Sequence, residues 1–345
     1  MGNLLLPTTV VGSHAYPGWF FTALEEMEQG RYGTTDAREA VDDAVNAAIL
    51  DQERAGVDIV SDGEMRRWYF VQSFYRRMEG LEQLPELRKT GVYGYDMPPR
   101  YRPVEPVTVP QGLGIVEEAR YARQVARRPL KVTCPGPLTL SIHIHTRDQP
   151  FYRDRLELCW AFVPVINAEL KALVAEGVDF LQIDEPSYAI IPGTAKDYLD
   201  LYNATVAGVE AKIALHVCFG NLGSRPRGPR RYAPLFPTFH EARADQFVLE
   251  FANREMKEIE RLKEFCQGRE VGLGVVDVKS FYVEPAEEIA KRIREGLQYI
   301  GPEKTFINPD CGFFQLPRWL TVMKLQRMVE ATQLVRRELT GQPLA

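Results

Sequence analysis

The chain has 345 residues, of which 45% are hydrophobic and 26% charged, and its formal net charge is −5. This composition is typical of a globular protein, and the length fits one α/β barrel with insertions. The mild negative charge argues against nucleic acid as the main partner.

Membrane and export signals are weak in this sequence. No stretch approaches the ~20 apolar residues of a membrane span, and the first residues lack the basic segment of a signal peptide. The five cysteines are odd in number and widely scattered, which is typical of reduced thiols rather than of a disulfide framework. We therefore expect a cytoplasmic protein without a membrane partner, and we leave a homodimer open.

Short runs of apolar and β-branched residues recur along the chain and predict eight strands. Each run is mostly apolar, as expected of parallel strands that are buried on both faces, and each ends in polar residues, Gly or Pro. The predicted strands cover residues 8–13, 57–64, 130–136, 178–186, 213–220, 246–251, 271–278 and 305–312.

Longer helical patterns separate these strands. Residues 36–56 begin with an acidic cap and end at a glycine, and residues 285–301 open with a proline in the first turn. Residues 154–177 also predict a helix, which Pro164 should kink or split. Eight alternating units predict a TIM (β/α)8 barrel, with an open doubly wound sheet as the alternative.

Two segments interrupt this alternation. Residues 80–112 are rich in Pro, Tyr and Gly and predict an insertion or hairpin after the second strand, within a single domain that covers residues 1–345. Residues 220–237 form a basic, Pro/Gly-rich loop after the fifth strand. Because loops after strands build the active site of a barrel, this loop is a candidate lid, with a solvated surface loop as the alternative.

Polar residues at the ends of predicted strands indicate a metal site. His216 and Cys218 occupy alternate positions of one strand, so their side chains point to the same side and can bind one ion. Glu250 and Cys311 end two other strands and would complete a four-residue site. Zinc takes His, Cys and Glu ligands in tetrahedral geometry. The set predicts a zinc site, although each thiol taken alone would more often be a core residue.

The same end of the barrel would carry further polar groups. His143 and His145 lie where we expect a helix to begin, and side chains two apart on a helix diverge, which favours a substrate contact over a metal ligand. No P-loop or GxGxxG motif supports ATP or a dinucleotide. The other polar strand ends are Gly12, Ser13, Asp62, Glu64, Asp184, Glu185, Asp277 and Asp310.

Taken in chain order, these segments resemble the C-terminal, catalytic half of cobalamin-independent methionine synthase. QIDEP matches the family's QxDEP pattern, NPDCG is identical to a family motif, and the resemblance covers nearly the whole chain. The segments that carry it are TTVVGS, SDGEMRR, CPGPLTL, QIDEP, HVCFGN, LEFANRE, GVVDVKS and NPDCG.

The resemblance implies a zinc-dependent methyltransferase and places the zinc ligands on the same four residues. It also places the pocket for an amino-acid thiol on Ser13, Glu64 and Asp184. Donors at Gly12 and Ser13 would hold a carboxylate, and the two acids would hold an ammonium. The alternative for the acids is structural pairing with Arg67 or with the arginine before it.

Departures from the family pattern bear on the methyl donor. The aromatic residue associated with stacking the folate ring is replaced by the segment SIHIH, so that His143 and His145 become candidate substrate contacts. The family histidine of YDIHS, a proton donor, is replaced by Lys279, a candidate catalytic residue with Glu64 and Asp184. The resemblance thus implies homocysteine as the acceptor and a donor other than polyglutamyl folate, such as a methylcorrinoid or a corrinoid protein.

Other functions stay open at this point. A zinc-dependent alkyltransferase could join another thiol, such as one like coenzyme M, to an electrophile such as an epoxide. A sulfonate thiol has no ammonium for Glu64 and Asp184 to bind, which favours an amino-acid thiol. A metal-free decarboxylase of the uroporphyrinogen type and a zinc-holding binding protein without turnover are the alternatives from other classes.

Overall fold

Six parallel strands form the main sheet, in the order β3-β4-β5-β6-β7-β8. The computed structural model describes residues 4–68, 70–85, 99–221 and 228–341. The strands are β3 (Val132–Pro135), β4 (Phe180–Asp184), β5 (Lys212–Val217), β6 (Gln246–Leu249), β7 (Glu270–Val276) and β8 (Thr305–Pro309).

The two remaining predicted strands, residues 8–13 and 57–64, are reduced to isolated parallel bridges. Side chains replace part of their backbone pairing, because the N–H of Thr8 is bound by Asp58 and the N–H of Ser61 is bound by Gln52. The bridges still lead from β8 back to β3, which fits a (β/α)8 barrel rather than an open sheet. They pair Thr8 with Ile307, Thr9 with Ile59 and Val60 with Leu130.

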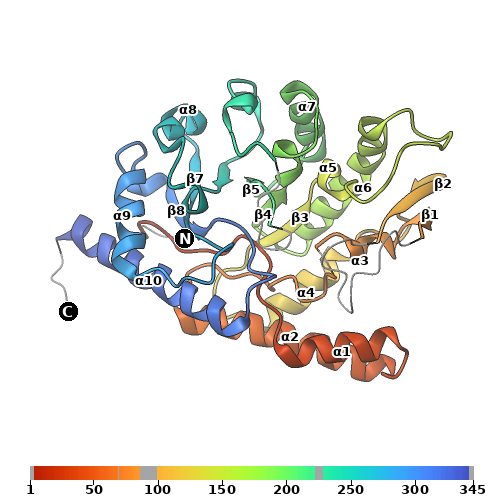
Figure 1. Ribbon diagram of the computed structural model, residues 1–345, viewed down its shortest axis with the longest axis horizontal. Coiled ribbons are helices and arrows are strands. Elements are labelled where there is room, and N and C mark those ends of the chain that lie inside the picture. The colour runs from red at the N-terminus through yellow and green to blue at the C-terminus, as the bar shows by residue number, and fades with distance from the viewer. Residues whose placement is uncertain (1–3, 69, 86–98, 222–227, 342–345) are drawn as a thin grey trace.

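Helices surround the strands, as Figure 1 shows. The predicted helix 36–56 is α2, which ends before Gly56 in the left-handed region at φ 88°. The predicted helix 285–301 is the shorter α9, preceded by Pro285. The helices are α1 (Gly18–Glu28), α2 (Thr34–Ala55), α3 (Gln72–Tyr75), α4 (Ile115–Val125), α5 (Pro137–Leu140), α6 (Arg155–Ala175), α7 (Ala195–Thr205), α8 (Leu262–Cys266), α9 (Ala286–Gly296) and α10 (Arg318–Thr340).

Helix α6 departs from the sequence expectation in two ways. It runs unbroken through Pro164, because burial of Leu158, Phe162, Ile166 and Leu170 against the barrel offsets the cost of an interior proline, about 3 kcal/mol. It is also long and apolar enough, by length and composition alone, to cross a membrane. Its apolar residues pack against α4, α5 and α7, as in the core helix of a globular domain.

The insertion predicted for residues 80–112 contains an antiparallel pair of strands, β1 (Glu79–Gln83) and β2 (Tyr101–Thr108). Part of this insertion, residues 86–98, lies outside the described residues.

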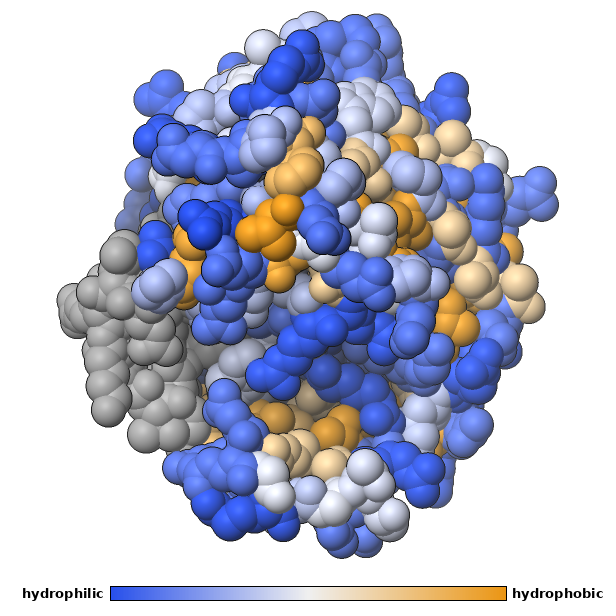
Figure 2. Space-filling model, turned by 90° about the vertical axis from the view of Figure 1, so that its right-hand side faces the viewer, coloured by the Kyte–Doolittle hydropathy of each residue, from blue (hydrophilic) through white to orange (hydrophobic). Residues whose placement is uncertain are grey.

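The face of the molecule on the right-hand side of Figure 1, where β1 and β2 lie, is mostly hydrophilic, with small separate hydrophobic groups (Figure 2). A homodimer and a cytoplasmic location stay predictions.

The interior of the barrel is built by the alternation of side chains along each strand. Phe180, Ala214, Val248 and Phe306 form an apolar cluster from four strands. Positions two or four residues further along the same strands share this inward face. Asp184 and His216 therefore emerge above a packed floor, at the carboxyl ends of the strands.

Candidate active site

Three of the four predicted metal ligands lie together at the ends of two strands. His216 lies in β5, Cys218 directly follows it, and Cys311 follows β8. Their ligand atoms all lie within 4.8 Å of one another, and the two Sγ atoms are 3.5 Å apart. All five cysteines of the chain are free thiols. The structure thus places one imidazole and two thiols where a single ion can contact all three. His216, Cys218 and Cys311 are called the metal group below.

The fourth predicted ligand, Glu250, lies beside this group but outside it. Its Oε2 accepts hydrogen bonds from Lys279 Nζ at 2.8 Å and from the N–H of Phe219 at 3.3 Å. Its Oε1 is buried without a hydrogen-bond partner among the described residues, and Arg230 Nη2 forms an ion pair with it at 3.7 Å. One oxygen of this carboxylate is therefore bound, and the other is available.

The donor set fits a zinc ion. Nδ1 of His216 is hydrogen-bonded to Asp184 Oδ1 at 2.8 Å, while its Nε2 is buried without a partner. A metal-binding histidine commonly donates its other ring N–H to a carboxylate, which fixes the tautomer and the ring orientation. Buried polar atoms normally have partners, and an ion would supply one for His216 Nε2 and one for Glu250 Oε1.

The protonation of the metal-free site already favours a thiolate. The pKa of Cys311 lies well below its usual value because Cys218 donates a hydrogen bond to it and His216 lies beside it. Burial lowers the pKa of His216, but Asp184 and Cys311 outweigh burial and raise it to about 9. Thiolates are the form of cysteine that binds metal.

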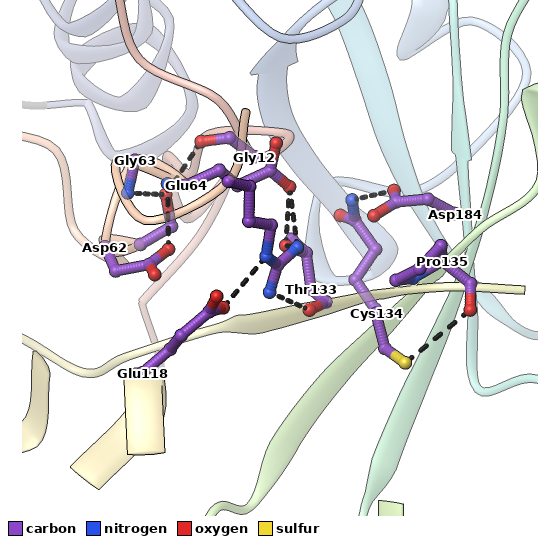
Figure 3. Close-up of polar contacts among 12 residues, drawn as sticks. Gly12, Asp62, Gly63, Glu64, Glu118, Thr133, Cys134, Pro135 and Asp184 are labelled. Atoms are coloured by element: carbon purple, nitrogen blue, oxygen red, sulfur yellow. Dashed lines mark hydrogen bonds and ion pairs between the residues drawn. The ribbon is translucent and has the colours of Figure 1, made fainter. Parts of the chain in front are cut away.

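The predicted ammonium pocket is built around Glu64, which lies at φ 56° in the turn after residues 59–60. Its Oε1 accepts hydrogen bonds from Thr133 Oγ1 at 2.7 Å and from Arg67 Nη1 at 3.2 Å. Arg67 Nε also donates to Glu118 Oε2 at 2.8 Å (Figure 3). Pairing with an arginine, the alternative considered for these acids, is therefore present, but the one guanidinium of Arg67 is shared between Glu64 and Glu118.

Burial raises the pKa of Glu64 to about 8, against the opposing charge of Arg67. The negative charge of Asp184 also contributes to this raised pKa. An arriving ammonium would lower it again, because an opposite charge favours the carboxylate. The pocket is therefore suited to a cationic group.

Asp184 connects this pocket with the metal group. Its Oδ1 binds His216 and also accepts a hydrogen bond from Gln182 Nε2 at 2.7 Å. Its Oδ2 is buried and has no hydrogen-bond partner. Gln182 is held in turn by the buried Lys131, whose Nζ lies 2.6 Å from Gln182 Oε1. Sequence reasoning missed this chain of contacts, although Asp184 and His216 end consecutive strands and pair in register.

Gly12 and Ser13, the residues predicted to bind the substrate carboxylate, each make a close approach to other residues of the site. A Cβ on Gly12 would lie 2.6 Å from Glu64 Oε1, and a Cβ on Gly312 would lie 2.1 Å from Ser13 Oγ. Because Gly312 directly follows Cys311, Ser13 lies beside the metal group. Gly12 thus lies close to the acidic pocket and Ser13 close to the thiols, and their binding of a carboxylate stays a prediction.

His143 and His145 lie elsewhere, and the expectation that a helix begins there is wrong. Helix α5 ends at Leu140, because the backbone turns to pair with β2: Tyr101 N–H donates to His143 O at 2.9 Å, and His145 N–H donates to Tyr101 O at 2.8 Å. Neither histidine belongs to the metal group found among the described residues. Burial lowers the pKa of His143 to about 4, so it is neutral at pH 7.

Other predicted polar strand ends have local structural partners. Asp310 accepts hydrogen bonds from the N–H groups of residues 251–253. Glu185 accepts them from the N–H groups of residues 138 and 139 in α5. Asp62 accepts one from the N–H of Glu64. These carboxylates hold turns beside the site.

The predicted lid, residues 220–237, is anchored where it is described. Tyr232 is fully buried, and its hydroxyl donates to the carbonyl oxygens at the ends of β5 and β6, those of Val217 at 3.1 Å and Glu250 at 3.2 Å. Residues 222–227 lie outside the described residues. The described end of this loop therefore braces the two strands that carry His216 and Glu250.

Comparisons with known proteins agree with this architecture. The model of the cobalamin-independent synthase catalytic domain matches residues 6–334. Methionine synthases of Saccharolobus solfataricus and Thermococcus kodakarensis are each 35% identical over 97% of this chain, which covers 96% and 95% of those proteins. The B12-independent methionine synthase of Shewanella sp. W3-18-1, solved with selenomethionine, aligns with a TM-score of 0.83 and 27% identity over 98% of this chain and 100% of that one.

Fold and relatives together define the chain as a barrel enzyme of the methyltransferase class. It belongs to the cobalamin-independent methionine synthase family.

Proposed function

We propose that this protein is a zinc-dependent methyltransferase that forms methionine by transferring a methyl group to the sulfur of homocysteine. The observation that carries the proposal is the position of Asp184, which binds His216 of the metal group through Oδ1, keeps Oδ2 buried and unpartnered, and acts through its charge on Glu64 of the acidic pocket. A thiol and an ammonium on one small molecule fit this arrangement.

Each group of residues has a distinct task in this proposal. His216, Cys218 and Cys311 hold the zinc ion, with Glu250 Oε1 as the fourth ligand. A bound zinc ion lowers the pKa of a thiol, so that the sulfur reacts as a thiolate at neutral pH. Holding donor and sulfur in line then supplies most of the rate gain.

The remaining residues orient the amino-acid end of the substrate. Glu64 and Asp184 bind the ammonium, and Gly12 and Ser13 bind the carboxylate through backbone and hydroxyl donors. The sulfur then lies over the metal group, because Ser13 contacts Gly312 beside Cys311. The thiol would release its proton to solvent, and the sulfur would then take the methyl group while the donor keeps the electron pair of the broken bond.

The electrostatics of the pocket support an amino-acid thiol over a sulfonate thiol. Glu64 and Asp184 would repel a sulfonate and would have no ammonium to bind. Lys279, a cation that could have attracted an anionic substrate, is bound to Glu250. The family relative from Shewanella was solved with selenomethionine, an amino acid with a methylated chalcogen, which also supports an amino-acid product.

The methyl donor is proposed to be something other than polyglutamyl folate, with a methylcorrinoid or a corrinoid protein first. The sequence SIHIH replaces the aromatic residue associated with folate stacking, and the backbone of His143 and His145 pairs with Tyr101 of β2. These two histidines are the proposed donor contacts.

The test is a donor panel combined with metal analysis. Homocysteine is incubated with methylcobalamin, methyltetrahydrofolate or S-methyl compounds, and methionine is measured. We expect one zinc per chain and methionine from a corrinoid donor. Absence of stoichiometric zinc would exclude the thiolate mechanism, and failure of every donor with homocysteine would shift the assignment to another thiol.

A further inference from the structure

Lys279 occupies the position where the resemblance places a titratable histidine, and its surroundings give it a different task. It follows β7, and only 2% of its side chain is exposed. Its N–H donates to Asp277 Oδ1 at 2.7 Å, and the N–H of Asp277 donates to Glu284 Oε1 at 2.8 Å. Glu284 is held by the buried Lys324 at 2.6 Å. These hydrogen bonds therefore hold the backbone of the segment that carries Lys279 in place.

The ammonium of Lys279 is paired with the carboxylate of Glu250. Nζ lies 2.8 Å from Glu250 Oε2, and the Glu250 side chain is fully buried. The N–H of Phe219 approaches the same oxygen, at 3.3 Å. The partner oxygen, Oε1, has no hydrogen bond. Lys279 thus binds one oxygen of the carboxylate, Oε2, and leaves Oε1 without a hydrogen bond.

We infer that Lys279 is a positioning residue that fixes Glu250 so that Oε1 alone is presented to the metal, and that it balances the charge of the metal centre. The inference rests on the proposed zinc site. Two thiolates and a carboxylate around a divalent cation would leave one buried negative charge, and a buried charge without a compensating partner is unfavourable. The buried ammonium of Lys279 supplies a positive charge at Oε2, and the partly exposed Arg230 lies 3.7 Å from Oε1.

This task differs from the proton donation expected of a histidine. A proton donor must face the reacting groups, whereas Lys279 Nζ is directed to a carboxylate that is itself beside the thiols. Partners that orient metal ligands from behind change metal affinity by about 10–100-fold when they are removed. The effect of Lys279 should therefore appear in metal binding and in the ligand field, before any methyl transfer occurs.

The test measures zinc affinity by competition with a chromophoric chelator and the visible spectrum of the cobalt-loaded protein. Four proteins are compared: wild type, Lys279→Met, Glu250→Gln and the double variant. We expect Lys279→Met to weaken zinc binding about 10-fold or more and to alter the cobalt bands. In the Glu250→Gln background the same change should add almost nothing, and Lys279→Arg should restore part of the affinity.

Lys212→Met is the matched control, because Lys212 also pairs with a glutamate, Glu270, but at the opposite end of the barrel. Its zinc affinity and cobalt spectrum should equal those of wild type. Equal losses from Lys279→Met with and without the Glu250 carboxylate would overturn the inference, as would an unchanged cobalt spectrum. Suppose that wild type binds zinc and forms methionine. Normal zinc binding by Lys279→Met would then refute this inference alone. Absence of zinc from wild type would instead refute the proposed function.

Discussion

Asp184 and His216 end neighbouring parallel strands and meet through a hydrogen bond of 2.8 Å between Oδ1 and Nδ1. The contact turns the free Nε2 of His216 towards the two thiols. The second carboxylate oxygen, Oδ2, is left buried and unpartnered. One aspartate thereby contacts the proposed metal ligand His216 and acts through its charge on Glu64, so its substitution should affect two measurable properties at once.

The first prediction concerns this shared aspartate. Asp184→Asn replaces one carboxylate oxygen by an amide, so the hydrogen bond to His216 and the charge for the ammonium are both impaired. We expect zinc affinity to fall about 10–100-fold and the KM for homocysteine to rise. Chelator competition and initial-rate kinetics measure the two effects. Asp200→Asn, at an exposed ion pair with Lys196, should change neither, and normal zinc binding by Asp184→Asn would contradict the role as orienting partner.

The second prediction concerns the thiols. Cys311→Ser removes a thiolate ligand, and we expect both loss of stoichiometric zinc and loss of methionine formation. Cys266→Ser changes a buried thiol of α8 that lies outside the metal group and should retain both. Metal content by emission spectroscopy and product by chromatography give the comparison. Full activity in a zinc-free Cys311→Ser protein would show that the reaction does not use this site.

The third prediction uses the close approach of backbone to carboxylate. In Gly12→Ala the new Cβ would lie 2.6 Å from Glu64 Oε1, so Glu64 must move. We expect weaker homocysteine binding with zinc content unchanged. Gly18→Ala is the matched control, because its Cβ would meet nothing within 4 Å. Calorimetric titration with homocysteine separates the two variants, and equal affinities would remove Glu64 from the ammonium pocket.

The fourth prediction is a pH dependence of stability. Burial raises the pKa of Glu64 from 4.5 to about 8, so the folded state holds this proton more tightly than the unfolded state. The stability contributed by the protonated group is complete below pH 4.5 and is lost as the pH rises towards 8. Glu64→Gln keeps a neutral side chain throughout, so its unfolding free energy should fall less over this interval.

Urea unfolding at a series of pH values measures that fourth effect. The control is Glu241→Gln. Glu241 is exposed at the end of the 3-10 helix Thr238–Glu241, so the pH profile of this variant should match that of wild type. Parallel pH profiles for wild type and Glu64→Gln would show that the pKa of Glu64 is not raised in the folded protein.

Sequence by itself determined much of the architecture. Runs of buried apolar residues that alternate with helical patterns predict a parallel barrel, because only a sheet covered on both faces accommodates such strands. The i and i+2 spacing of His216 and Cys218 places both on one side of β5, a consequence of strand geometry alone. The ends of two other predicted strands supplied Glu250 and Cys311 as the expected partners of this pair, and the family resemblance placed the zinc ligands on the same four residues.

Tertiary structure decided what no local pattern contains. Three contacts join residues from separate strands or loops. Asp184 pairs with His216, Arg67 pairs with both Glu64 and Glu118, and Lys279 pairs with Glu250. The turn of residues 141–145 towards β2 likewise depends on a hairpin far away in sequence. Local periodicity fixes which face a side chain occupies, but only the packed fold sets which charges are buried together and therefore which oxygen or nitrogen stays free to bind.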